Sequence, residues 1–151
     1  MLIKVFVQNQ TGSNLKHYHD EKTLVFKSTK TVSRPYPFPY GFILGTTARD
    51  GCNVDCYVVT RRPLETGQVV ECTPIGLMEQ FEDGEEDHNV LASFPGERAE
   101  IDREIEVILT DFVQNVFRHE PNKRIRAGRF LPASEAEAHI KTRWDASQQR
   151  T

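Results

Sequence analysis

The chain has 151 residues and a formal net charge of −3. That length is enough for one domain with a buried core, and we expect a single domain over residues 1–151. The acidic balance argues against nucleic-acid binding through overall charge. No stretch approaches the roughly 18 apolar residues of a membrane span, and MLIKVFVQNQ at the N-terminus has no signal-peptide core. Three cysteines without framework spacing predict a reducing compartment, the cytoplasm.

The first two thirds of the sequence predict short β-strands. Five runs share an apolar, β-branched composition between turn residues: 2–7, 24–28, 54–60, 68–80 and 89–94. The stretch RPYPFPYGF at 34–42 carries three prolines, which exclude a helix and a central strand and predict an extended edge segment. The acidic FEDGEEDH at 81–88 predicts a hairpin loop around Gly84. Strands at this spacing predict a closed or partly closed barrel.

The last third predicts two helices. Apolar residues at spacings of three and four over 97–119 indicate one amphipathic helix, which Glu120-Pro121-Asn122 ends. The basic KRIRAGRFL at 123–131 predicts a strand or loop, and a capping box at 134–137 predicts a second helix to about Trp144, before a frayed QQRT tail. The expected fold class is α+β, mainly β: a barrel with two C-terminal helices packed on it.

Carboxylates concentrate in two places. Asp50 and Asp55 lie in ARDGCNVDC, and strand alternation places Asp55 on the face opposite Cys56. The second set lies on the acidic hairpin at 81–88. If the two segments face each other, their oxygens suit a hard cation such as Mg²⁺, which polarises phosphoryl oxygens and lowers the pKa of a bound water.

Simpler interpretations exist for each feature. An acidic hairpin is more often a solvated tip, and Asp-Gly is more often a turn former than a ligand pair. Cys52 and Cys56 invite a zinc interpretation, but their spacing is loose and no second pair follows. Cys56 and Cys72 alternate into apolar strands, which indicates core positions.

Four segments in order, YPFPYGFI, DGCNVDC, PIG and GEEDHNVLA, resemble the soluble family I inorganic pyrophosphatases. That family reads Y-P-x-x-Y-G-[FY]-I, D-G-D-P-x-D, R-P-[IV]-G and G-E-D-x-K-[LV]-[LV]-A, and the spacing holds with about one inserted residue in the acidic loop. The resemblance implies a five-stranded OB-like barrel with flanking helices, Mg²⁺ as cofactor, pyrophosphate as substrate and a homo-oligomer.

The resemblance also implies roles for individual residues. Asp50, Asp55 and Asp87 would hold the first catalytic metal, and Glu82 or Asp83 would add a further ligand. Asp55 and Tyr40 are the expected catalytic residues. The expected phosphate contacts are Lys16, Tyr40 and, in the family's Tyr-Lys position, Arg118.

Several positions depart from the family pattern. Cys52 replaces the middle aspartate of D-G-D-P-x-D, a residue that helps to activate the attacking water, and Asn53 replaces the proline. Asn89 stands for the lysine two residues after the metal aspartate, Gln8 for a first-strand glutamate, and Tyr18 for a glutamate. An arginine of the third strand has no clear match: Ser28 or Lys27 occupies its neighbourhood, and Lys30 or Arg34 could compensate for it.

Three functions compete on this evidence. The first is a divergent, slow metal-dependent diphosphatase, because three converging carboxylates repel one another unless a cation joins them. The second is a catalytically inactive relative that binds metal, phosphate or a protein partner. The third, an OB-like nucleic-acid binder using KRIRAGR, is disfavoured by the net charge and by the lack of interleaved aromatic residues.

Cys52 suggests one narrower hypothesis. A thiol is a poor partner for Mg²⁺, so Cys52, with His88 beside Asp87, would shift the preference toward Mn²⁺, Co²⁺ or Zn²⁺.

Overall fold

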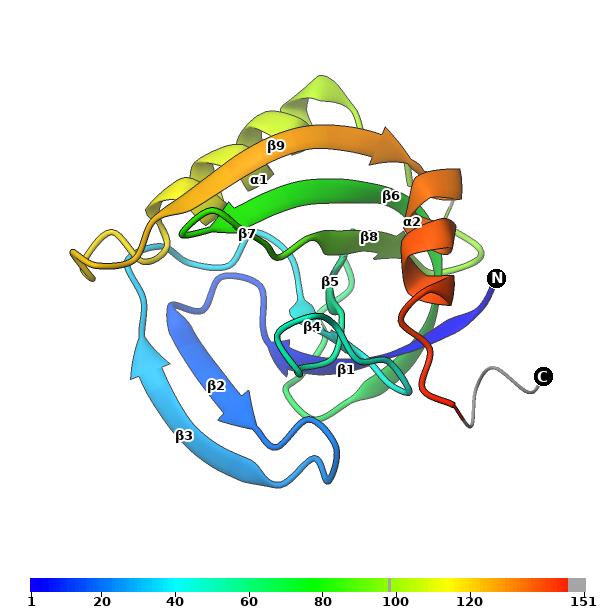
Figure 1. The fold of residues 1–151 in the computed structure, drawn as a ribbon, viewed down its shortest axis with the longest axis horizontal. Coiled ribbons are helices and arrows are strands. Elements are labelled where there is room, and N and C mark those ends of the chain that lie inside the picture. The colour runs from blue at the N-terminus through cyan, green and yellow to red at the C-terminus, as the bar shows by residue number, and fades with distance from the viewer. Residues whose placement is uncertain (98, 147–151) are drawn as a thin grey trace.

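The computed structural model of the chain describes residues 1–97 and 99–146. Figure 1 shows a curved sheet with one helix along it and one at its end. The elements are β1 (Ile3–Asn9), β2 (Leu15–His19), β3 (Phe26–Thr31), β4 (Tyr40–Ile43), β5 (Asp55–Val58), β6 (Val69–Glu82), β7 (Glu85–Glu86), β8 (Asn89–Ser93), α1 (Arg103–Asn115), β9 (Ile125–Pro132) and α2 (Ala133–Lys141).

Five strands pair in a closed ring. The pairings run β1–β4, β4–β5, β5–β8, β8–β6 and β6–β1, and all are antiparallel except β5–β8. Strand β6 closes the ring because it is long: Val69–Cys72 pair with β1, the middle pairs with β8, and the far end pairs with β9 and β7. The expected mainly β, OB-like fold with two C-terminal helices is confirmed.

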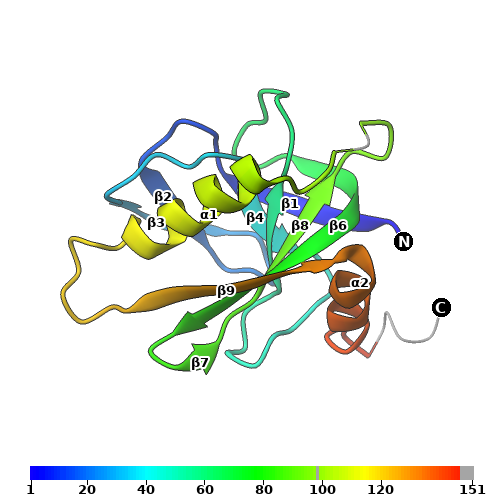
Figure 2. The ribbon, with the colours of Figure 1, turned by 90° about the horizontal axis from the view of Figure 1, so that it is seen from above.

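The sheet separates two buried clusters, one on each face. One includes Cys56 and Val58 of β5 and packs against Ile140 of α2. The other includes Tyr57 of the same strand and packs against Phe112 of α1. Side chains alternate between the two faces of a strand, so one short strand supplies both clusters. Figure 2 shows α1 and α2 as separate elements outside the sheet.

Most predicted strands are confirmed, with one addition and one correction. Strand β2, which the sequence did not predict, pairs with β3 as a separate two-stranded sheet. The proline-rich segment was expected to be an edge, but it leads into β4, which lies between β1 and β5. The prolines end at Pro39, so every residue of β4 keeps its N–H.

Both helices are shorter than predicted. Helix α1 begins after Asp102, whose side chain accepts the Ile105 N–H at 2.9 Å, whereas Glu97 accepts a hydrogen bond from Thr60 instead. After Asn115 the chain continues in turns held to Ser33, through the Val116 carbonyl.

The predicted capping box at 134–137 is wrong. Helix α2 begins at Ala133 with Pro132 as its N-cap, and no side chain caps it. Ser134 already lies in the first turn, because the fixed backbone of Pro132 leads directly into the helix. The helix ends at Lys141 rather than near Trp144, which forms a β-bridge with Thr46. The QQRT segment lies outside the described residues.

No helix within residues 1–97 and 99–146 is long and apolar enough to span a membrane.

Candidate metal and phosphate site

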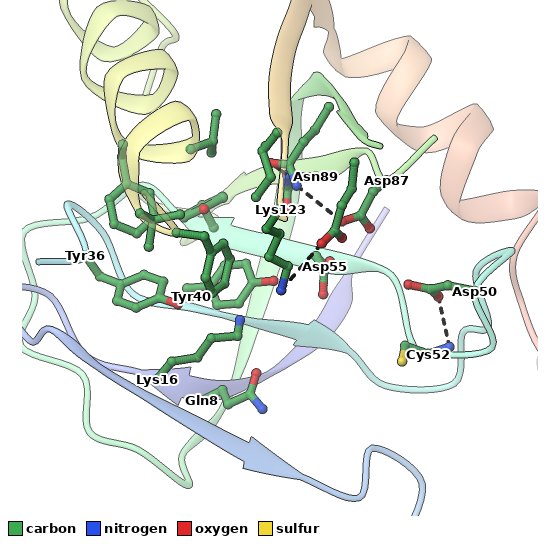
Figure 3. Close-up of a pocket in the computed structure, with 18 of the residues that line it drawn as sticks. Gln8, Lys16, Tyr36, Tyr40, Asp50, Cys52, Asp55, Asp87, Asn89 and Lys123 are labelled. Carbon is green, nitrogen blue, oxygen red and sulfur yellow. Dashed lines mark hydrogen bonds and ion pairs between the residues drawn. The ribbon is translucent and has the colours of Figure 1, made fainter. Parts of the chain in front are cut away.

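A polar pocket of about 220 Å³ opens on the face of the sheet that carries Asp55 and Tyr57. The β2–β3 hairpin supplies Lys16, helix α1 supplies Phe112, and the acidic hairpin supplies Asp87. Figure 3 shows Lys16, Asp55 and Asp87 pointing toward one another from elements far apart in the sequence. The predicted approach of the two acidic segments therefore occurs, with Asp55 on one and Asp87 on the other.

Six of the residues expected from the sequence line this pocket: Lys16, Tyr40, Asp50, Asp55, Glu82 and Asp87. Within the described residues, Asp83 and Arg118 do not line it. Asp83 is a turn residue with a positive φ of 52°, and its carboxylate accepts the Arg124 N–H at 3.2 Å. Arg118 is exposed beyond the end of α1. Of the Glu82 and Asp83 pair left open by the sequence, Glu82 is the one in the pocket.

Three further polar residues line the pocket and were not predicted: Glu21, Gln80 and Lys123. Lys123 opens the basic KRIRAGR segment, and its Nζ lies 3.4 Å from Glu82 Oε1. The rest of that segment contacts other groups: Arg126 stacks on Phe81 at 4.6 Å, and Arg129 pairs with Glu79 at 2.8 Å. Nothing local in the sequence separates Lys123 from its basic neighbours.

The pocket disfavours the charged forms of its ionisable side chains. Burial raises the pKa of the Asp55 carboxyl well above its usual range; Asp87 raises it further, and a hydrogen bond from Tyr40 partly offsets the shift. The pKa of Asp87 is also raised, first by burial and then by Asp50. Burial lowers the pKa of Lys16, because the charged ammonium loses water. A bound cation would relieve the two carboxylates directly.

A hydrogen-bonded chain orients Asp87. The buried Asn89 amide donates to Gln80 Oε1 at 2.8 Å, and Gln80 Nε2 donates to Asp87 Oδ2 at 3.2 Å. Asn89 thus holds Asp87 through Gln80 with neutral amide groups.

An aromatic wall closes one side of the pocket. Tyr40 stacks on Tyr36 at 5.5 Å and packs against Tyr57 at 4.8 Å, and Lys16 Nζ lies 4.8 Å from the Tyr40 ring centroid. Burial raises the pKa of the Tyr40 hydroxyl well above its usual range, so Tyr40 remains a neutral donor.

The cysteines do not form a metal pair. Cys52 is exposed at the pocket rim, whereas Cys56 and Cys72 are buried in the core, as predicted. The zinc interpretation of Cys52 with Cys56 is wrong, because strand alternation sends Cys56 to the opposite face of β5. His88 accepts the Gln80 N–H through Nδ1 at 3.1 Å and does not line the pocket.

The donor set suits a hard divalent cation. Carboxylate oxygens are the ligands that Mg²⁺ prefers, and Mg²⁺ usually keeps several waters rather than an all-protein cage. Among the described residues, no three acidic, histidine or cysteine side chains converge closely enough to hold an ion directly. The pocket therefore fits a cation bound by one or two carboxylates and by waters that the remaining carboxylates orient.

Comparison with known proteins agrees with this architecture. The family model described as "Inorganic pyrophosphatase" matches residues 5–146. A Saccharolobus solfataricus inorganic pyrophosphatase is 30% identical, over 92% of this chain and 88% of the relative. The Sulfolobus acidocaldarius enzyme of that name is 37% identical over a shorter region, covering 60% of this chain and 54% of the relative.

A solved structure shows the same fold. The Anaplasma phagocytophilum protein titled inorganic phosphatase superimposes with a TM-score of 0.86 at 24% identity, covering 94% of this chain and 91% of that one. The fold, a five-stranded ring with two C-terminal helices, is that of the inorganic pyrophosphatases. The chain belongs to the inorganic pyrophosphatase family.

Proposed function

We propose that this protein hydrolyses inorganic pyrophosphate to phosphate with Mg²⁺, at a reduced rate. The observation that carries the proposal is the placement of opposite charges in one pocket. Asp50, Asp55 and Asp87 face the same space as Lys16 and Lys123. Carboxylates suit the metal and the two cations suit phosphate oxygens, so the pocket provides for both parts of a metal–pyrophosphate complex.

The roles follow from position. Asp55, Asp87, Asp50 and Glu82 would hold the metal ion directly or through its bound waters, with Asp55 at the centre because it lies deep in the pocket and is hydrogen-bonded to Tyr40. When bound, Mg²⁺ polarises phosphoryl oxygens and lowers the pKa of a bound water.

The remaining pocket residues act on the substrate. Lys16 and Lys123 bind phosphate oxygens, and Tyr40 donates its hydroxyl proton in hydrogen bonds within the site. The aromatic residues beside Tyr40 exclude water from that side, which strengthens the charge interactions. Arg118, exposed and outside the pocket, is the weaker choice for a phosphate contact, and Lys123 takes its place in this proposal.

The rate is expected to be low because the pocket lacks groups that the family pattern has. Cys52 supplies no carboxylate, Asn89 supplies no charge, and Gln8 lines the pocket as a neutral amide. Loss of one contribution to proton transfer typically costs on the order of 10²–10⁴ in rate. Losses within one site do not multiply independently, so measurable turnover remains compatible with several departures.

Phosphate release from pyrophosphate tests the proposal. The purified protein is assayed with Mg²⁺, Mn²⁺, Co²⁺ and Zn²⁺ beside Asp55→Ala and Cys52→Asp. If the native protein releases phosphate and Asp55→Ala does not, the proposal is supported. A higher rate in Cys52→Asp would show that the missing carboxylate at position 52 limits the native rate. A rate profile equal for Mg²⁺ and Zn²⁺ in both the native protein and Cys52→Ser would refute the hypothesis that Cys52 selects a softer metal.

The alternative function is a binding module without turnover. The neutral amides of Asn89 and Gln8 in the pocket favour it, because they leave fewer charges for transition-state stabilisation. A protein that is inactive with every metal, and that binds pyrophosphate or phosphate in an Mg²⁺-dependent manner, would establish this alternative. Calorimetric titration with each anion distinguishes the two functions.

We also propose a homo-oligomer. Two adjacent apolar side chains on α1, Val107 and Ile108, are 51% and 37% exposed. A contact with a second copy of the chain would cover them. Light scattering coupled to gel filtration measures the mass in solution, and a mass of 17.3 kDa at all concentrations would refute the proposal.

A further inference from the structure

The tip of the β2–β3 hairpin is docked on the loop that carries Cys52. Lys22 Nζ donates to the Thr46 carbonyl at 2.8 Å, to Thr47 Oγ1 at 2.9 Å and to Asn53 Oδ1 at 2.6 Å. These contacts join residues 24 to 31 positions apart in the sequence. The docking fixes the position of the neighbouring residue, Glu21, relative to the same loop.

Glu21 points into the pocket rather than into solvent. Its Oε1 accepts the Asn53 N–H at 2.8 Å, and the side chain lines the pocket together with Asp50, Cys52 and Asp55. Asn53 directly follows Cys52 in the chain, so this hydrogen bond holds the Glu21 carboxylate beside the segment that carries Cys52.

The substitution at position 53 makes this arrangement possible. Asn53 is 3% exposed, and three of its polar groups are hydrogen-bonded. Its N–H donates to Glu21, its Oδ1 accepts from Lys22, and its Nδ2 donates to the Ile43 carbonyl at 3.0 Å. A proline, which the family pattern has at this position, lacks the N–H and the amide. Where the sequence departs from the family pattern at positions 52 and 53, the Glu21 carboxylate reaches the same loop from the β2–β3 hairpin.

We propose that Glu21 supplies to this metal site the carboxylate that position 52 lacks, and that Asn53 holds it in place. This inference rests on the proposed metal site and adds a residue to it. Glu21 has one oxygen engaged by Asn53, so the other is available to a cation or to a water bound to it. An arrangement in which Glu21 only caps the Asn53 N–H is the competing explanation.

Metal affinity without turnover separates these two explanations. Mn²⁺ binding is titrated by the electron paramagnetic resonance of the free ion, for the native protein and for Glu21→Gln. The glutamine keeps the shape and an oxygen that accepts the Asn53 N–H, but removes the charge. If Glu21 belongs to the metal site, Mn²⁺ binds about 10–100-fold more weakly, the range found when groups that support a metal site are removed.

Two further variants complete the design. Glu71→Gln removes a similar charge from an exposed position on β6, outside the pocket, and is expected to leave the Mn²⁺ affinity unchanged. The double variant Cys52→Asp, Glu21→Gln restores a carboxylate beside the one that was removed. We expect its Mn²⁺ affinity to return to within about threefold of the native value. This recovery would also show that Glu21→Gln does not weaken binding merely by misfolding.

The outcomes are distinct from those of the proposed function. An Mn²⁺ affinity of Glu21→Gln within twofold of the native value overturns the inference, even if the protein hydrolyses pyrophosphate. If Glu21→Gln binds Mn²⁺ more weakly and adding Cys52→Asp restores the affinity, the inference is supported. This holds even if no metal gives turnover and the proposed function fails.

Discussion

Replacing Asp55 by asparagine should stabilise the metal-free protein while removing its response to metal. Burial and the charge of Asp87 raise the pKa of Asp55, so its ionised form is unfavourable in the folded chain. Asparagine keeps the shape and removes the charge. We expect the free energy of unfolding in chelator at pH 7 to rise by about 1–2 kcal/mol, the upper part of the range for a single stabilising substitution.

The pH dependence of this gain has a definite sign. A carboxyl whose pKa is raised on folding binds more protons in the folded than in the unfolded chain, so stability falls as pH rises from the unfolded pKa of about 3.9 through the folded pKa. Well below the unfolded pKa of about 3.9, Asp55 is protonated in both states. The advantage of Asp55→Asn should therefore be present at pH 7 and vanish at about pH 3 and below.

Mg²⁺ should reverse the order of stability. At a concentration about 100 times its dissociation constant, a ligand that binds only the folded state adds about 2.7 kcal/mol. The native protein gains this amount and Asp55→Asn does not, so the native protein becomes more stable by about 1 kcal/mol. Urea unfolding, followed by tryptophan fluorescence, measures the free energy of unfolding of the metal-free protein in chelator and of the metal-bound protein in Mg²⁺. Glu71→Gln is the control. A variant less stable than the native protein in chelator at pH 7 would refute the reasoning.

Three other predictions concern the substrate, the ring and a surface pair. Lys16→Met should raise the KM for pyrophosphate about tenfold or more, because a hydrogen bond to a charged group contributes about 1.5–3 kcal/mol, and should not weaken Mn²⁺ binding. Gly41→Ala should cost about 3 kcal/mol or more in urea unfolding, since its Cβ would lie 1.8 Å from the Phe6 carbonyl oxygen. Glu79→Gln should lower the urea midpoint at pH 7 but not at pH 2, because Arg129 lowers the pKa of Glu79 to about 2 and that stabilisation is lost as pH falls from about 4.3 toward 2.

Each of these has an outcome against it. An unchanged KM in Lys16→Met would place the lysine outside the substrate site. For Gly41, Gly96→Ala is the matched control, since its added Cβ meets no atom within 4 Å; equal losses in the two variants would contradict the packing argument. A Glu79→Gln deficit that persists at pH 2 would show that the side chain acts through packing rather than through its charge.

The sequence determined what depends on neighbours along the chain. Strand alternation placed Asp55 and Cys56 on opposite faces, and the β6–β7 hairpin turns at Gly84 as predicted. The order and spacing of the four motifs indicated the family, and with it the Lys16 and Tyr40 positions that the pocket contains. These features follow from local periodicity, turn chemistry and motif spacing, which one sequence displays directly.

Tertiary structure decided what depends on contacts between distant segments. The pairing of β1 with β6 closes the ring across more than 60 residues, and the pairing of β4 with both β1 and β5 makes it an interior strand. Glu21 enters the pocket only because Lys22 and Asn53 join the hairpin to a loop about 30 residues away, and Lys123 enters while its basic neighbours turn outward. No local pattern encodes such contacts, since their geometry is set by the packing of the whole sheet.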